Sequence, residues 1–162
     1  MKPKYAIDEI ERRWLVAAED AEPYLQDAAL RIVDKYIDGC RLRLRMIEDT
    51  DGECVYKFCK KYGRHYSNQQ EPAEPITNLY LDSNEYTTLK LLPGTVVNKE
   101  RFKLRSGAID RYRLSDETVY IFEIEFPDTS AARNYSPPEF VGEEVTGRED
   151  YSGFTLAQRS RA

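Results

Sequence analysis

The sequence predicts an α+β fold that is mostly β-structure with a few helices. Aromatic residues make up 12% of the 162-residue chain, and 12 of them are tyrosines, which favour strands. Short segments that alternate apolar and polar side chains recur along the chain, with turn residues between them. The length suits one domain, residues 1–162, because domains commonly have about 100–200 residues.

The N-terminal half contains strands joined by tight turns. Asp38-Gly39 and the run that ends in Asp51-Gly52 have the composition of hairpin turns. Pro23 lies near the start of segment 22–29, which favours a short helix or turn there. The predicted strands of this half are 6–17, 31–37, 41–47 and 54–62.

The C-terminal half begins with a polar, proline-containing stretch, 66–75, which predicts a loop. Asp82 or Ser83 is a suitable cap for a helix that runs to about Leu92, where Pro93-Gly94 ends it. The last segment, 140–156, has helical tendency interrupted by three glycines. The predicted strands of this half are 76–81, 97–105, 108–114 and 118–126.

Composition excludes several classes of protein. Hydrophobic residues at 41% and charged residues at 33% exclude a disordered chain, and the net charge of −5 argues against a nucleic-acid partner. No apolar run approaches the roughly 18 residues that a membrane span needs, and the N-terminus lacks the apolar core of a signal peptide. We therefore expect a cytoplasmic protein that does not bind membranes.

The three cysteines, Cys40, Cys54 and Cys59, form no disulfide framework. His65 is the only histidine, so a Cys/His zinc site would be short of ligands. We interpret the cysteines as reduced thiols and His65 as a surface residue of a loop.

Charged side chains are sorted by sign among the predicted strands. Alternate residues of a strand share one face, and several strands carry only cations at such positions. Two other segments, at opposite ends of the chain, each read Glu-Ile-Glu. The cations at shared positions are Arg41, Arg43, Arg45, Lys57, Lys61, Lys99, Arg101, Lys103 and Arg105, and the paired carboxylates are Glu9, Glu11, Glu123 and Glu125.

Two interpretations account for this sorting. The first is a sheet that presents one polar face to water, with ordinary cross-strand ion pairs of little energetic value. The second is a sheet that closes with the charges inside. The carboxylates would then supply hard oxygen ligands for Mg²⁺ or Mn²⁺, and the cations would require a polyanion to neutralise them. That combination suits the binding and cleavage of a phosphate chain.

In these residues the sequence resembles the CYTH domains, also called triphosphate tunnel metalloenzymes. Residues 9–16, EIERRWLV, stand where that family has a stretch like EIERKFLV, so Arg13 takes the position of the signature lysine. The similarity runs from about residue 6 to residue 157. Its other segments are Arg41-Leu42-Arg43, Tyr56-Lys57-Phe58, 76–81, Lys99-Glu100-Arg101, 109–112, 123–125, 141–148 and Tyr151-Ser152.

The resemblance implies an eight-stranded antiparallel β-barrel, a tunnel, with peripheral helices, and hydrolysis of inorganic triphosphate or an organic triphosphate with Mg²⁺ or Mn²⁺. It also implies that the glycine-rich segment 142–153 plugs or gates one mouth of the tunnel. Carried over by position, Glu9, Glu11, Glu123 and Glu125 would hold the metal, and Arg13, Lys57 and Asp110 would be catalytic. The implied triphosphate-binding residues are Arg41, Arg43, Lys57, Lys99, Arg101 and Lys103.

Three departures from the family pattern leave alternatives open. Arginine replaces the signature lysine at position 13. The family has a charged strand before its middle helix, whereas segment 76–81 of this chain carries no charge. The glycines that commonly follow the segment corresponding to 109–112 are missing. If the cations bind a phosphate compound but the protein does not hydrolyse it, the protein is a polyphosphate- or nucleotide-binding module. A third possibility is an adenylate cyclase of the same family. The expected partner is in each case a small-molecule phosphate compound, and a homodimer is left open.

Overall fold

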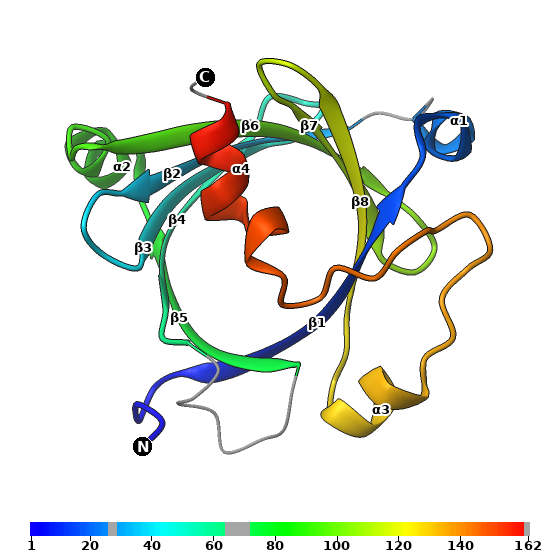
Figure 1. Cartoon of the computed structure of the whole chain (residues 1–162). Helices are drawn as coiled ribbons and strands as arrows, with labels where there is room; N and C mark the ends of the chain where they lie inside the picture. Colours follow the sequence, from blue (N-terminus) through cyan, green and yellow to red (C-terminus); the bar gives the residue numbers. More distant parts are fainter. Residues whose placement is uncertain (26–28, 64–71, 161–162) are drawn as a thin grey trace.

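Eight strands close into one antiparallel barrel in the computed structural model, which describes residues 1–25, 29–63 and 72–160. Figure 1 shows the barrel in a view that looks into its interior. The predicted fold class is confirmed. Around the barrel the strands follow the order β1-β5-β4-β3-β2-β6-β7-β8. Their bounds are β1 (Ile7–Val16), β2 (Leu30–Ile37), β3 (Leu42–Glu48), β4 (Cys54–Lys61), β5 (Ala73–Leu81), β6 (Gly94–Lys103), β7 (Ala108–Arg113) and β8 (Thr118–Glu125).

Short helices lie outside the barrel or across one of its ends (Figure 1). None of the described helices is long and apolar enough to span a bilayer. The α-helices are α1 (Ala18–Ala21), α2 (Ser83–Leu89), α3 (Thr129–Asn134) and α4 (Gly153–Arg159), and the 3₁₀ turns are η1 (Glu22–Tyr24) and η3 (Glu149–Tyr151).

Hairpin turns set the register of the charged strands. Gly39, between β2 and β3, and Gly52, between β3 and β4, have φ values of 69° and 83°, which glycine adopts without steric cost. The resulting register places Asp34 opposite Arg45, and Arg45 opposite Lys57. Because directly paired residues point to the same face of a sheet, this register gathers charged side chains inside the barrel.

The structure corrects several predicted boundaries. Strand β5 begins at Ala73, within the segment predicted to be a loop, and residues 66–71 of that segment lie outside the described residues, as does His65. Helix α2 has the predicted Asp82 cap, a capping box with Glu85, but ends at Leu89 rather than Leu92. Helix α3 was not predicted.

The predicted helical segment 140–156 is mostly not a helix, because its first part pairs with β1. Strand β5 pairs only with residues 7–10 of β1, so the rest of that edge needs other hydrogen-bond partners. The Gly142 N–H donates to the Leu15 carbonyl oxygen (2.7 Å), and the Val145 N–H donates to the carbonyl oxygen of Arg13 (2.8 Å). Helical structure begins only after the segment that hydrogen-bonds to β1, and α4 starts at Gly153.

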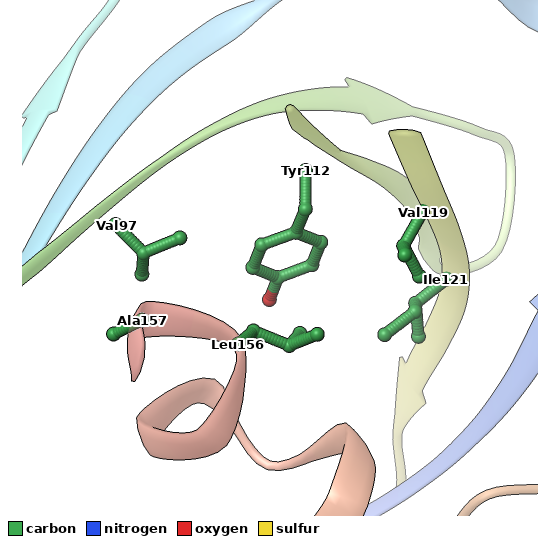
Figure 2. Close-up of a cluster of buried hydrophobic side chains, with 6 residues drawn as sticks. All are labelled: Val97, Tyr112, Val119, Ile121, Leu156 and Ala157. Carbon is green, nitrogen blue, oxygen red and sulfur yellow. The ribbon is translucent and has the colours of Figure 1, made fainter. Parts of the chain in front are cut away.

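Helix α4 lies across one end of the barrel and covers an apolar cluster there (Figure 1). Figure 2 shows the Tyr112 ring between Val97 and Ile121, with Leu156 and Ala157 of α4 facing it. A separate cluster around Trp14 and Phe122 packs against α1 and the chain after α3. The interior is therefore apolar at the α4 end and charged further in.

Candidate functional site

The charged part of the barrel encloses a cavity of about 570 Å³. Strands form most of its lining, and residues 146–149 and 152–154, which include the start of α4, contribute to it as well. Eight of the described lining side chains are cationic and seven are acidic. A cavity of this composition holds polar, charged ligands rather than apolar ones.

Apart from Arg13 on β1 and Asp34 on β2, the charged lining residues of the strands are separated by sign into different arcs of the barrel. The cationic wall comprises residues of β3, β4 and β6, and the acidic wall comprises residues of β5, β1 and β8, which are neighbours in the closed sheet. The cationic wall consists of Arg43, Arg45, Lys61, Lys99 and Arg101, and the acidic wall consists of Glu9, Glu11, Glu74, Glu123 and Glu125.

Asp110 of β7 holds two cations of the cationic wall. Its carboxylate is fully buried and accepts hydrogen bonds from the Lys99 ammonium (2.6 Å) and from the Arg101 Nε (2.7 Å) and Nη2 (2.8 Å). The Lys99 ammonium also donates to the Tyr112 hydroxyl at 3.2 Å. Asp110 is not among the described residues that line the cavity, so the structure places it behind Lys99 and Arg101.

Asp34 of β2 does the same for the two arginines of β3. It accepts two hydrogen bonds from Arg45, and its Oδ1 lies 3.7 Å from the Nε of Arg43. Burial opposes ionisation, but Arg45 and Arg43 outweigh it and hold the pKa of Asp34 well below its usual range. Each pair of cations in these strands therefore has its own buried aspartate.

Two carboxylates of the acidic wall are occupied by neighbouring cations. The Lys61 ammonium donates to Glu9 at 2.6 Å, and against the effect of burial it lowers the pKa of Glu9. Glu123 accepts a hydrogen bond from Arg101. Burial opposes ionisation of Glu123 too, yet Lys99, Arg101 and Arg13 lower its pKa well below the ordinary value. The two walls therefore meet in ion pairs along both of their borders.

Glu11 and Glu125 differ from the other glutamates, because within the described part of the chain neither forms a hydrogen bond or ion pair. They lie directly opposite each other on β1 and β8. Burial raises the pKa of Glu11, with Lys61 opposing the shift and Glu123 adding to it. Burial also raises the pKa of Glu125, and Glu9 and Glu123 add to that shift. Two carboxylates that lie directly opposite each other, neither of them in a direct ion pair, are a suitable place for a cation.

The four glutamates predicted to hold a metal thus face one cavity, but they do not form a ready-made coordination shell. Over residues 1–25, 29–63 and 72–160, no group of three or more His, Cys, Asp or Glu side chains is arranged to hold a metal ion. The donor chemistry nevertheless fits a hard divalent cation, since carboxylate oxygens are its preferred ligands. Glu11 and Glu125 are available as they stand, whereas Glu9 and Glu123 are engaged by Lys61 and Arg101.

Arg13 connects the cavity to the segment that leads into α4. Its Nη1 donates to the Tyr151 carbonyl oxygen at 2.9 Å, and its Nε lies 3.8 Å from Glu123. That Nε is buried and has no hydrogen-bond partner among the described residues. Burial works against ionisation, but Tyr112, Glu11 and Glu123 raise the pKa of Arg13 above its ordinary value. Arg13 is therefore a fixed positive charge that holds the closing segment in place.

The remaining predicted residues are Arg41, Lys57 and Lys103. Arg41 lines the cavity, but 61% of its side chain is exposed and it contacts Glu74 at 3.4 Å. Lys57 and Lys103 are not among the described lining residues. The Lys57 ammonium lies 5.0 Å from the centre of the Tyr80 ring, and Lys103 is exposed at the end of β6.

Sequence reasoning did not select Asp34, Arg45, Lys61 or Glu74 as site residues, although all four line the cavity. Arg45 and Lys61 lie at alternate positions from the selected Arg43 and Lys57, so they point to the same face of their strands. Asp34 directly follows the apolar pair Ile32-Val33 in the predicted strand 31–37, and its position in the Asp38-Gly39 hairpin could have shown that it faces Arg45. Glu74 lay in a segment predicted to be a loop.

The barrel resembles solved structures of known proteins. Two are crystal structures of NE1496, described as a hypothetical protein (24% identity over 92% of this chain and 97% of that chain, TM-score 0.52) and as an inorganic triphosphatase (22% identity over 93% and 95%, TM-score 0.52). A third is a Bacillus halodurans protein proposed to be an adenylate cyclase (17% identity over 94% and 92%, TM-score 0.55). No protein-family model and no curated protein sequence matches the chain.

These likenesses cover nearly the whole of each chain, and at such low identity they show a shared fold. The molecule is thus a closed antiparallel barrel with a charged internal cavity. It shares its fold with an inorganic triphosphatase and with a proposed adenylate cyclase.

Proposed function

We propose that this protein belongs to the triphosphate tunnel metalloenzymes and hydrolyses inorganic triphosphate or an organic triphosphate with Mg²⁺ or Mn²⁺. The observation that carries the proposal is the separation of charge inside one cavity: five cations on β3, β4 and β6 face five glutamates on β5, β1 and β8. A surface exposed only to water does not require such sorting. The fold shared with an inorganic triphosphatase supports the same conclusion.

The cationic wall supplies the phosphate-binding groups. Lys99 and Arg101 are held by Asp110, and Arg45 is held by Asp34, so their positions are fixed before a ligand arrives. Guanidinium groups bind phosphate oxygens through paired N–H donors. Groups fixed in this way stabilise the charge that develops on a phosphoryl group during transfer, with little reorganisation.

The acidic wall supplies the metal-binding groups. Glu11 and Glu125 would hold the divalent cation, and Glu9 and Glu123 would join them once Lys61 and Arg101 turn to the phosphate chain. When bound, the cation would polarise the phosphate oxygens and lower the pKa of a coordinated water. The nearly equal numbers of cations and acids in the lining also favour this role, because a polyanion that enters a cavity of almost neutral charge needs further positive charge.

Arg13 favours a second candidate function, a module that binds a polyphosphate or nucleotide without hydrolysing it. Its guanidinium remains protonated and is tied to the backbone at Tyr151, so it cannot exchange protons with a substrate as a lysine could. Binding by the cationic wall does not depend on such an exchange. The proposal also includes a cytoplasmic location, which the three free thiols support.

The test is phosphate release from tripolyphosphate, ATP and pyrophosphate in the presence of Mg²⁺, Mn²⁺ or a chelator. The proposal predicts metal-dependent release of orthophosphate with tripolyphosphate preferred, and no release with the chelator. Release of pyrophosphate from ATP would instead identify a cyclase. Tight binding of tripolyphosphate without release of either product would identify the binding module.

A further inference from the structure

Asp34 and Arg45 form a close ion pair inside the cationic wall. Asp34 is 2% exposed, and both of its carboxylate oxygens accept hydrogen bonds from Arg45, from Nε at 2.6 Å and from Nη2 at 2.7 Å. The two residues are directly opposite on β2 and β3. This bidentate geometry fixes the plane of the Arg45 guanidinium.

Arg43, two residues away on the same face of β3, is in a different state. Its Nε lies 3.7 Å from Asp34 Oδ1, which is too long for a hydrogen bond. This buried Nε has no hydrogen-bond partner within the described part of the chain. A buried donor without a partner is costly, and Arg43 lines the cavity, so a phosphate oxygen is a suitable acceptor for its guanidinium.

We propose that Asp34 is a positioning residue for the phosphate chain: it holds Arg45 in one orientation and leaves the donors of Arg43 available to the ligand. This inference rests on the proposed function, because it assumes that the cavity receives a triphosphate. Asp34 itself does not touch the ligand in this account. It acts through Arg45, whose guanidinium would otherwise be free to bind the ligand in a second geometry.

The proposal makes a prediction opposite in sign to that of simple electrostatics. Removing a carboxylate from a cationic wall should strengthen anion binding if charge alone matters, because the attraction between the wall and the anion then increases. If Asp34 positions the arginines, the same change should weaken binding, because the fixed donor geometry is lost. The direction of the change in affinity therefore separates the two roles.

The experiment is calorimetric titration of the full chain with tripolyphosphate in the presence of Mg²⁺, for the unchanged protein and for Asp34→Asn. We expect Asp34→Asn to bind about tenfold more weakly, as loss of one charge-assisted hydrogen bond would give. Glu48→Gln is the matched control. It removes the Arg31–Glu48 ion pair, which joins the same two strands on the outer face of the barrel, and should leave affinity unchanged.

A second pair of variants keeps the test valid if Asp34→Asn does not fold. Arg45→Gln keeps Asp34 beside Arg43, and the double variant Asp34→Asn with Arg45→Gln removes both members of the Asp34–Arg45 pair. If Asp34 acts through Arg45, the two variants bind tripolyphosphate equally weakly. A double variant that binds clearly more weakly than Arg45→Gln overturns the inference, as does an Asp34→Asn variant that binds as well as the unchanged protein or better.

Failure of the proposed function gives a different result. If the unchanged protein does not bind tripolyphosphate with or without Mg²⁺, the proposed function is wrong and the role of Asp34 is wrong with it. If the unchanged protein binds and Asp34→Asn binds equally well, only the role of Asp34 is wrong.

Discussion

The cationic and acidic walls of the barrel differ in how their charges are compensated. On the cationic wall, the buried carboxylates of Asp34 and Asp110 hold Arg45, Lys99 and Arg101 by short hydrogen bonds. On the acidic wall, Glu11 and Glu125 lie opposite each other and, among the described residues, have no hydrogen-bonding or ion-pairing group. The protein itself therefore pairs the cations held by Asp34 and Asp110, but leaves two carboxylates of the acidic wall without a direct ion pair.

This difference indicates which half of the site depends on a ligand. Buried charges that are hydrogen-bonded to opposite charges are stable without further partners, whereas two ionised carboxylates placed directly opposite each other, as Glu11 and Glu125 are, repel each other. A divalent cation would relieve that repulsion, and its site would then face the phosphate-binding groups across the cavity. The following predictions test this contrast, from the largest expected effect to the smallest.

Changing both carboxylates Glu9→Gln and Glu11→Gln should reduce metal-dependent phosphate release from tripolyphosphate by at least about a hundredfold. The reason is loss of metal-ion stabilisation, which is worth several kcal/mol in a transition state. Phosphate release is measured at saturating Mg²⁺. Glu53→Gln, an exposed carboxylate after the β3–β4 turn, should keep full activity, and unchanged turnover in the double variant would contradict the metal assignment.

Replacing Arg43→Ala on the cationic wall should raise KM for tripolyphosphate about tenfold, since a charged hydrogen-bond donor to the ligand is removed. The comparison is with Arg113→Ala, whose side chain is 64% exposed and pairs with Glu100. Steady-state kinetics should show no change in KM for Arg113→Ala. Equal effects of the two changes would mean that the cavity arginine makes no particular contact with the substrate.

Stability should fall at strongly acidic pH through the aspartate of the cationic wall. The pKa of Asp34 is lowered in the fold, so its contribution is fully present above the unfolded pKa of about 3.9 and is lost as pH falls toward the folded value. Urea unfolding between pH 5 and the acid limit should show this loss in the unchanged protein and a weaker pH dependence in Asp34→Asn. The free energy of unfolding of the exposed variant Asp51→Asn should depend on pH as that of the unchanged protein does. The same pH dependence in Asp34→Asn would contradict a stabilising role for the Asp34 carboxylate.

Glu11→Gln should stabilise the protein when no metal is present, by about 2–4 °C in Tm. The folded pKa of Glu11 is raised, so its charged form destabilises the fold near neutral pH and a neutral amide removes that penalty. Thermal unfolding in chelator measures the effect. Added Mg²⁺ should raise the Tm of the unchanged protein more than that of Glu11→Gln. A lower Tm for Glu11→Gln in chelator would show that the carboxylate is already compensated.

Much of the barrel could be predicted from local pattern. Alternating strands and hairpin glycines such as Gly39 and Gly52 depend on short-range sequence, and they placed β2, β3 and β4 within one residue of their observed bounds. The position of segment 142–145 could not be predicted in this way. Its conformation depends on the unpaired edge of β1, which lies more than a hundred residues earlier in the chain.

The candidate site shows the same limit. Strand parity identified Glu9, Glu11, Arg43, Lys99 and Arg101 as side chains that face one cavity. The alternation of side chains alone could not show which residues reach the cavity, so Lys57 and Lys103 were predicted although neither is among the described lining residues. It also could not show that Asp110 is buried behind two cations, because that depends on pairing among β6, β7 and β8.

Binding of Mn²⁺ tests the contrast between the walls most directly, because electron paramagnetic resonance detects free Mn²⁺ without any need for turnover. Titration of the unchanged protein and of Glu11→Gln should show Mn²⁺ bound by the unchanged protein and clearly weaker binding by the variant. Glu53→Gln should bind as the unchanged protein does. Equal loss of the Mn²⁺ signal for Glu11→Gln and the unchanged protein, or no loss for either, would contradict the conclusion that the acidic wall holds a divalent cation.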